Sequence, residues 1–213
     1  MIEGNAQAML DGVYQHPDAG LQAIVDRTRG LTRLVDDVRD LSLAEVGRLS
    51  LETSDLVLAP LVADVVRGMG RLAEAKGVRL RVHVADAGMA RADGMRLRQV
   101  LGNLISNAIR HTPVGGSVTV TAHPASQAMV AITVADSGKG IAPDDLPHVF
   151  DRFYRANSSR ARMPGGSGLG LAIVHALVSA MGGTVDVDSG PDEGATFRLA
   201  LPAASVKPDP ASP

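Results

Sequence analysis

The sequence predicts an α+β fold, a two-layer α/β sandwich in which helices cover one face of a mixed, largely antiparallel sheet, preceded by a helical hairpin. Three observations lead there. Residues 1–48 show apolar side chains only at helical spacing. After residue 49, segments of strand-like alternation come in neighbouring pairs joined by short turns, and amphipathic helical segments lie between the pairs. Strands joined by hairpins, with helices spaced between them, indicate helices packed on one side of a sheet.

The composition fits an intracellular globular protein. The chain has 213 residues, of which 45% are hydrophobic, so it can bury a core in one or two domains. The net charge of -2, with both signs interspersed, excludes the basic surface of a nucleic-acid-binding protein. The absence of cysteine excludes disulfides and cysteine-bound zinc. No apolar run reaches the ~20 residues that cross a bilayer and no signal peptide opens the chain, so we expect a soluble, cytoplasmic protein.

Residues 1–48 predict a helical hairpin. Residues 1–13 indicate a short helix and residues 14–18 a turn, because Pro17 disfavours helix in the residue before it. From Ala19 onwards the spacing of threes and fours predicts a longer helix. The first arm is too short to cover the second. The residues that define the spacing are Ile24, Thr28, Leu31, Leu34, Val35, Val38 and Leu41.

Residues 49–201 predict the main domain. Alternating apolar side chains indicate strands, and the gap PASQA between two of them suits a hairpin. Residues 202–213 (PAASVKPDPASP) lack the apolar content of a core, so we expect a disordered tail. The expected helices are 56–75, 95–110 and 168–181, and the expected strands are 78–84, 117–123, 129–135, 184–187 and 195–201.

The helix expected over 95–110 carries a polar stripe beside its apolar face. Asn103 and Asn107 are four residues apart, so their side chains lie one above the other. Amide oxygens at this position can ligate a hard cation such as Mg²⁺. An ordinary solvated helix face is the alternative. The stripe consists of Arg96, Gln99, Asn103, Asn107 and Arg110.

Two glycine-rich segments also indicate ligand binding. Asp136 ends a strand and begins DSGKGI, where a carboxylate can accept a hydrogen bond from an exocyclic amine while glycines admit a ring. Residues 165–171 (GGSGLGL) open an apolar helix, where free backbone N–H groups favour an anion. Their spacing is neither GxGxxG nor a Walker sequence. A plain turn and a flexible hinge are the respective alternatives.

The segment 149–155 (VFDRFYR) lies between these glycine segments. Phe150 and Phe153, three residues apart, indicate an apolar anchor on one face of a helical turn. Arg155 can reach phosphates from there. A surface loop with an apolar anchor is the alternative.

Taken in order, these segments resemble one known family. RLRQVLGNLISNAIRHT, DSGKGI, VFDRFYR, GGSGLGLAIV and GATF are similar to the N, first glycine, F, second glycine and closing boxes of the ATP-binding domain of two-component sensor histidine kinases. The match covers about residues 50–201, and residues 1–48 resemble part of the family's dimerisation and phosphoacceptor hairpin. The resemblance implies a GHKL-type domain with the Bergerat ATP-binding fold over 49–201.

The resemblance also implies ATP and Mg²⁺ as cofactors and assigns the site. Asn107 matches the Mg²⁺ ligand, and Arg110 and Arg155 match phosphate-facing residues. Asp136 matches the carboxylate that binds the adenine amine. The other matching nucleotide-binding residues are Asn103, His111, Gly138, Gly140, Ile141, Gly166, Gly168, Leu169, Gly170 and Thr196.

The resemblance fails at the start of the chain, because no H box (His, an acidic residue, then Arg-Thr-Pro) occurs. We therefore expect transfer of the γ-phosphoryl group of Mg-ATP to a histidine that this chain lacks, as in a truncated or split kinase. The expected partners are ATP, an H-box segment and a response regulator. We expect a weak homodimer or none, and no autophosphorylation. A longer parent chain can be membrane-anchored.

Three other functions remain open. A GHKL-type ATPase of the gyrase, heat-shock chaperone or mismatch-repair type carries a glutamate base where this chain has Asn103, and an amide cannot take a proton from water. An anti-sigma-type serine kinase lacks both the hairpin and the FDRFYR segment. A nucleotide-binding module without turnover is the non-enzymatic alternative.

Overall fold

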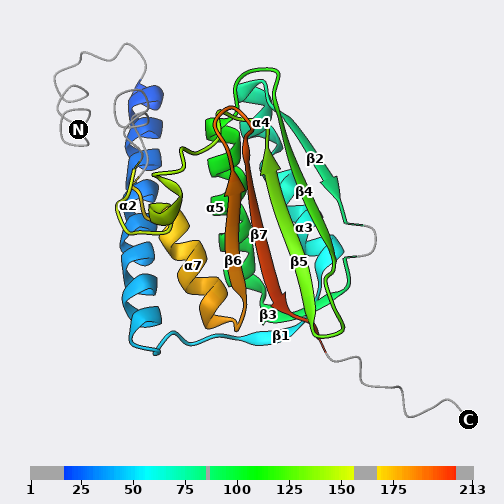
Figure 1. The fold of residues 1–213 in the computed structure, drawn as a ribbon. Coiled ribbons are helices and arrows are strands. Elements are labelled where there is room, and N and C mark those ends of the chain that lie inside the picture. Colours follow the sequence, from blue (N-terminus) through cyan, green and yellow to red (C-terminus); the bar gives the residue numbers. More distant parts are fainter. Residues whose placement is uncertain (1–16, 85–86, 156–166, 205–213) are drawn as a thin grey trace, which may run out of the picture.

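The computed structural model describes residues 17–84, 87–155 and 167–204 (Figure 1). Their centre is a five-stranded sheet in the order β2-β4-β5-β7-β6. β2 lies parallel to β4, and the other neighbours are antiparallel, which confirms the predicted mixed sheet. The strands are β2 (Arg79–His83), β4 (Ser117–Pro124), β5 (Met129–Asp136), β7 (Ala195–Pro202) and β6 (Thr184–Ser189).

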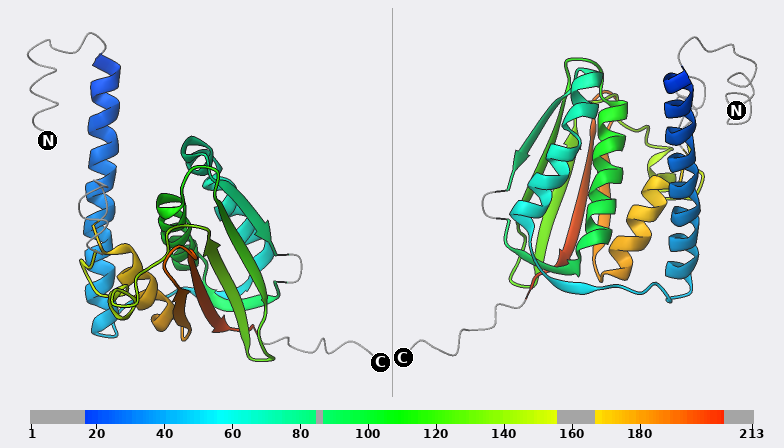
Figure 2. Two further views of the ribbon diagram at one scale, coloured as in Figure 1. Left: turned by 45° about the horizontal axis from the view of Figure 1, so that its top comes forward. Right: turned by 180° about the vertical axis from the view of Figure 1, so that it is seen from behind.

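The helices lie on one side of this sheet: they stand in front of it in the right-hand view of Figure 2, and the opposite side faces the viewer in Figure 1 without a described helix over it. α5 (Gly94–His111) lies at the centre of the helical layer, with α3 (Leu58–Gly68) and α4 (Gly70–Lys76) on one side of it and α7 (Gly170–Ala180) on the other. α2 (Pro17–Glu45) runs beside α7 at the margin of the layer. The described fold is the predicted two-layer sandwich.

The core forms because strand alternation and helical spacing present apolar side chains to each other. Val118, Val120 and Ala122 of β4 and Val130, Ile132 and Val134 of β5 are buried, which is every second residue of each run. The apolar arc of α5 packs against this face, with Leu101 and Leu104 fully buried. Phe197 on β7 is the largest of the fully buried side chains.

The sequence did not predict a second, small sheet. β1 (Thr53–Val57) and β3 (Met89–Asp93) pair antiparallel beneath the helices. β1 takes the first residues of the helix expected over 56–75, and the remainder breaks at Met69, which has a glycine on either side. Glycine is a poor helix former, so two glycines around one residue favour a break.

Both ends of the described chain differ from expectation. Pro17 and Asp18 belong to α2 instead of a turn, because proline fits the first turn of a helix. Residues 202–204, which the composition assigns to the disordered tail, belong to the fold: Ala203 bridges Ala90, and the Ala204 N–H donates to the Met89 carbonyl. The expected first arm at 1–13 and the tail at 205–213 lie outside the described residues.

A search of the described helices finds none with the length and apolar content needed to cross a membrane.

Asp93 connects the small sheet to α5. Its buried carboxylate caps the helix by accepting from the N–H groups of Met95 (2.9 Å) and Arg96 (3.1 Å), and it also accepts from the Glu52 N–H at 2.9 Å. We predict that Asp93→Ala lowers the free energy of unfolding by about 1–3 kcal/mol, measured in urea. The exposed Asp55 pairs with Arg91 at 3.2 Å, and Asp55→Ala should cost less than about 1 kcal/mol. Equal losses in the two variants would contradict the capping role.

Candidate functional site

The two halves of the polar stripe of α5 contact different helices, α7 and α2. At its C-terminal half, the Asn103 amide donates to the carbonyl of Gly170 at 3.4 Å, which places Asn103 against the start of α7. Asn107, one turn further on, and His111 are partly buried, and Arg110 is exposed. At the N-terminal half, Arg96 and Gln99 contact α2. The stripe is therefore not an ordinary solvated face.

The first glycine segment packs on the end of α5. Asp136 is the last residue of β5, and its carboxylate accepts from the Gly138 N–H at 2.8 Å. A Cβ added at Gly138 would lie 2.7 Å from the carbonyl oxygen of His111, closer than real side chains approach. Glycine at this position therefore lets the DSGKGI loop lie directly against the helix that carries Asn107.

The same loop is joined to the turn between β6 and β7. Gly140 (φ +69°) lies against the carbonyl of Gly190, and Gly194 (φ +77°) lies against the carbonyl of Asp136, so neither position has room for a Cβ. The Ile141 N–H donates to Ser189 Oγ at 2.9 Å. The sequence indicated this region only through GATF, which begins at Gly194, and did not predict that the preceding turn contacts the DSGKGI loop.

The segment 149–155 (the F segment) packs directly against the second glycine segment, 165–171, at Phe153 and Gly168. The Phe153 N–H donates to the Gly168 carbonyl at 3.0 Å, and Gly168 (φ +73°) lies against the Phe153 backbone. Leu169 is buried, and Gly170 begins α7. This tight packing disfavours the hinge interpretation of these glycines.

One phenylalanine of the F segment behaves as expected and the other does not. Phe150 contacts the core through an edge-on arrangement with Phe197, with ring centroids 6.4 Å apart. Phe153 is 65% exposed and has a positive φ of 59°, so it shares no helical face with Phe150. The prediction of two anchoring phenylalanines was wrong for Phe153, because the packing of Gly168 imposes a turn there.

Thr196 stands apart from the other predicted site residues. In the register of β5 and β7, Asp136 pairs with Ala195, and Thr196 pairs with Ala135. Side chains alternate along a strand, and Ala195 and Phe197 are buried towards the helices. Thr196 therefore lies on the opposite sheet face from Asp136. The partly buried Arg155 borders residues outside the described part of the chain, and Gly166 lies outside it.

Burial changes the acid–base behaviour of two residues in the site. Burial raises the pKa of Asp136 above its ordinary value, against the opposing effect of the Gly138 and Ala195 N–H groups. Burial, followed by the positive charges of Lys139, Arg110 and Lys76, lowers the pKa of His111. The site therefore combines a carboxyl group that holds its proton more tightly than usual with an imidazole ring that holds its proton less tightly than usual.

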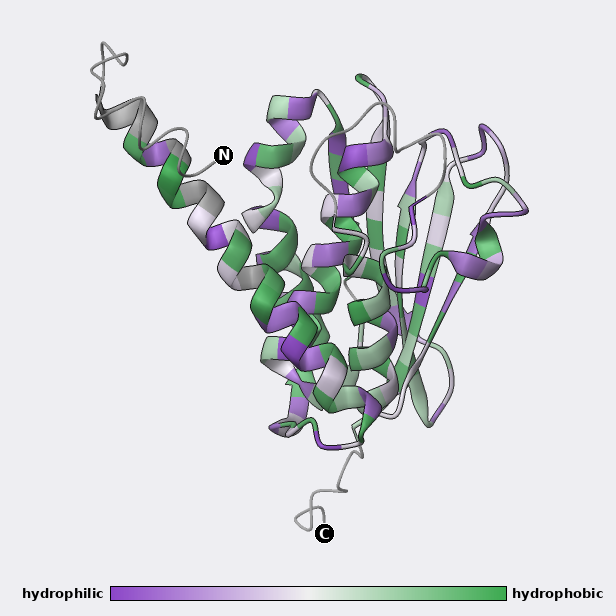
Figure 3. Ribbon diagram, turned by 90° about the vertical axis from the view of Figure 1, so that its left-hand side faces the viewer, coloured by the Kyte–Doolittle hydropathy of each residue, from purple (hydrophilic) through white to green (hydrophobic). Residues whose placement is uncertain are grey.

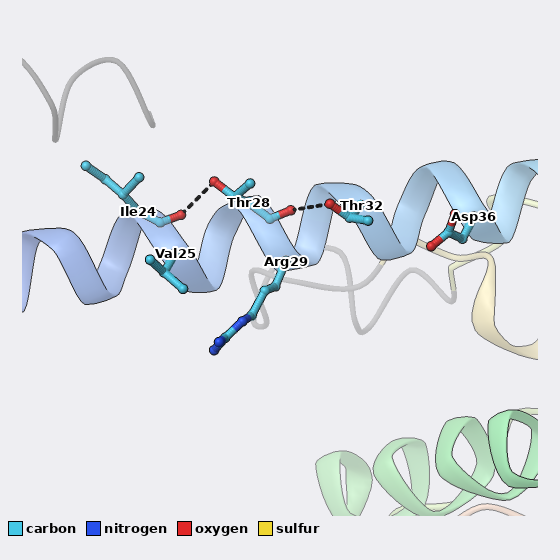
Figure 4. Close-up of a pocket in the computed structure, with 6 residues that line it drawn as sticks. All are labelled: Ile24, Val25, Thr28, Arg29, Thr32 and Asp36. Atoms are coloured by element: carbon cyan, nitrogen blue, oxygen red, sulfur yellow. Dashed lines mark hydrogen bonds between the residues drawn. The ribbon is translucent and has the colours of Figure 1, made fainter.

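The residues fit a nucleotide with a bound cation. A carboxylate has about four acceptor positions, so Asp136 can accept an amine proton in addition to its backbone bonds. The start of α7 offers N–H groups to phosphates, and Asn107 offers an amide oxygen to a hard cation. By contrast, a surface depression on α2, lined by Ile24, Val25, Thr28, Arg29, Thr32 and Asp36, contains none of these residues (Figure 4).

Residues 92–205 match the family model HATPase_c, described as histidine kinase-, DNA gyrase B- and HSP90-like ATPase. The chain belongs to this family. Within it, the similar proteins are sensor histidine kinases. The chain is 33% identical to the signal transduction histidine-protein kinase BaeS of Escherichia coli K12 over 202 residues, which are 95% of this chain and 43% of BaeS. It is 42% identical to the sensor histidine kinase CusS of E. coli O6:H1 over 81% of this chain and 35% of CusS.

Solved structures agree with this membership. Full-length ShkA in complex with AMPPNP matches with a TM-score of 0.76 at 31% identity, covering 88% of this chain and 39% of ShkA. The Acinetobacter baumannii histidine kinase AdeS also matches with a TM-score of 0.76, at 26% identity, covering 96% of this chain and 94% of the AdeS chain. The chain thus contains an ATP-binding catalytic domain of the sensor histidine kinase type. It spans less than half the length of BaeS and CusS.

The raised pKa of Asp136 predicts a pH-dependent stability. The folded state holds this carboxyl's proton more tightly than the unfolded state, so ionisation at neutral pH destabilises the fold. The destabilisation disappears as pH falls through the folded pKa towards the unfolded value near 4. We predict that Asp136→Asn, which still accepts from Gly138, raises Tm at pH 7 and that the gain shrinks towards pH 4.

The exposed Asp144→Asn controls for the loss of one negative charge. A Tm gain for Asp136→Asn that matches this control, or that grows on acidification, would contradict the assignment.

Proposed function

We propose that this chain transfers the γ-phosphoryl group of Mg-ATP to a histidine on an H-box segment, as the catalytic part of a two-component sensor histidine kinase. The observation that carries the proposal is the closure of five motif segments, widely separated in the sequence, around one site. Asn103 contacts Gly170, Gly138 packs on His111, Gly194 packs on Asp136, and Gly168 packs on Phe153. AMPPNP in the ShkA structure and the names of BaeS and CusS support the same function.

The adenine end of the site is assigned to Asp136 and its neighbours. Asp136 accepts from the adenine amino group, and the neutral ring of His111 packs beside the base together with Ile141. Gly138 and Gly140 have no side chains, so the base can approach the backbone closely there. Thr196 takes no part in this arrangement, because the strand register turns it to the other sheet face.

The phosphate end of the site is assigned to the C-terminal half of α5 and the start of α7. Asn107 ligates the cation, and Asn103, held by its bond to Gly170, supports it from one turn earlier. Arg110 and Arg155 offset phosphate charge, and the N–H groups around Gly166, Gly168, Leu169 and Gly170 bind phosphate oxygens. Bound Mg²⁺ supplies charge neutralisation. Phosphoryl transfer needs this positioning and neutralisation more than covalent assistance.

No group of three acidic, histidine or cysteine side chains gathers around a possible metal position among the described residues. A cation at Asn107 therefore depends on the amide oxygen, nucleotide phosphates and water, which is how Mg²⁺ commonly binds in phosphoryl-transfer sites. The acceptor histidine comes from an H-box segment, and a response regulator receives the phosphoryl group afterwards. We propose that this chemistry takes place in the cytoplasm and that the chain forms at most a weak homodimer.

Substitutions in the two ends of the site should weaken nucleotide binding. We predict that Asn107→Ala removes the metal ligand and Asp136→Asn weakens the bond to the adenine amine, each raising the Kd for Mg-ATP by at least about tenfold, or ~1.4 kcal/mol. Isothermal titration calorimetry measures both. Ser106→Ala, the neighbour on α5, and Asp144→Asn are matched controls and should bind like the parent. If Asn107→Ala and Asp136→Asn both bind Mg-ATP with the Kd of the parent chain, the assignment of the nucleotide site is wrong.

The reaction itself should be transfer to histidine with little hydrolysis. Asn103 cannot act as a base towards water, and its amide is already bonded to Gly170, so we predict phosphate release near background. Radiolabelled ATP, this chain and a separate H-box hairpin fragment should give acid-labile phosphate on the fragment and none on this chain alone. Acid-stable phosphate would indicate a serine kinase, and rapid release of free phosphate lost in Asn107→Ala would indicate an ATPase.

A further inference from the structure

The DSGKGI loop (residues 136–141) and the turn between β6 and β7 (residues 189–194) meet with little apolar surface between them. Residues 136–140 and 189–194 contain no valine, leucine, isoleucine, methionine or aromatic residue. In Figure 3, hydrophilic residues run along the loops at the upper right, beyond the ends of the strands. Apolar burial therefore contributes little here, and the relative position of loop and turn depends on hydrogen bonds and close backbone packing.

One hydroxyl group links the end of the loop to both ends of the turn. Ser189 is the last residue of β6, and its Oγ accepts from the Ile141 N–H at 2.9 Å and donates to the Gly194 carbonyl at 2.5 Å. A hydroxyl has one proton and two lone pairs, and an amide N–H can only donate, so the hydroxyl proton goes to Gly194. Both bonds therefore form at the same time.

The position of this hydroxyl explains why a side chain is used. The ladder between β6 and β7 ends at the pair Ser189 and Ala195. Beyond it, the Asp192 N–H donates to the Lys139 carbonyl at 2.8 Å, which joins the middle of the turn to the middle of the loop. At the Ile141 end of the loop, the Ser189 hydroxyl takes the place of a ladder bond as the partner of the backbone N–H.

Removing the hydroxyl leaves two backbone groups without this partner. The carbonyl belongs to the buried Gly194 and the N–H to the partly buried Ile141, so the loss is costly unless the loop moves. Ile141 packs against the core, and the Asp136 carbonyl lies directly against Gly194. A shift of the loop therefore displaces both residues that the adenine end of the site uses.

We propose that Ser189 is a positioning residue of the base pocket, whose hydroxyl holds the DSGKGI loop in the conformation that receives the adenine ring. This role rests on the proposed function, which assigns Asp136 and Ile141 to the base. Ser189 acts through these two residues and not through the phosphates. Its effect is therefore the same for nucleotides that share the base and differ in the number of phosphates.

Calorimetric titrations with Mg-ATP and with ADP test this role. We expect Ser189→Ala to raise the Kd for both nucleotides by a similar factor, about tenfold. Ser189→Thr keeps the hydroxyl and should bind both within about threefold of the parent chain. Ser126→Ala is the matched control, because it removes a serine bond to the Ala128 N–H in the turn at the opposite end of β5, and it should bind like the parent.

Amide NMR of the nucleotide-free chain gives a second measurement. Ser189→Ala should shift the Ile141 amide and speed its hydrogen exchange, while the Gly168 amide on the second glycine segment stays in place. A Ser189→Ala variant with the parental Kd, even one with a lower Tm, would overturn the positioning role, and so would a threonine variant as weak as the alanine variant. Failure of the parent chain to bind either nucleotide would instead refute the proposed function, and the base pocket with it.

Discussion

The candidate site depends on glycines at which two backbone segments, distant in the sequence, pack directly against each other. At Gly140, Gly168 and Gly194 the chain has positive φ and lies against the backbone of a distant segment. A side chain at any of these positions would push apart two segments that must meet. The F segment, both glycine loops and the β6–β7 turn take their places around the site through these contacts.

α5 is the element that connects this site to the rest of the molecule. Its apolar arc fills the core, and its polar stripe is shared between the site and α2. Asn103 contacts the start of α7, while Arg96 and Gln99 contact Asp40. One helix thus holds Asn103 against the start of α7 and also carries the ionic contact with Asp40 of α2.

The parts of the fold with strong periodicity could be predicted from the sequence. α5 has a complete apolar arc, and β4 and β5 alternate without interruption, so their existence and type followed from pattern alone. β3 reads MARAD, where alanine and charged residues give no strand signal, and its pairing with β1 depends on tertiary contact. The small sheet and the start of α3 were therefore missed.

For the candidate site too, some features could be predicted from the sequence and others could not. The structure brings together the segments of Asp136, Asn103 and the glycines, which the sequence singled out by their motifs, and their roles in the site stay a prediction. Thr196 was misassigned, because only the register shows that Ala195 lies opposite Asp136. Phe153 was expected to pack beside Phe150, but helical spacing cannot report a positive φ imposed by Gly168. The roles of Arg96 and Gln99 were invisible, since their partners are 56 and 62 residues away.

The most direct test of the account is an amide NMR titration of the ¹⁵N-labelled chain with Mg-ATP. The account predicts that the largest shifts fall on Asn107, His111, Gly138, Gly140 and Gly168, from three segments that meet only in the folded domain. Amides of the uncovered sheet face, such as those of Thr121 and Thr133, should stay in place. Shifts concentrated on that face, or spread over α2 while the glycine segments remain unchanged, would contradict the site.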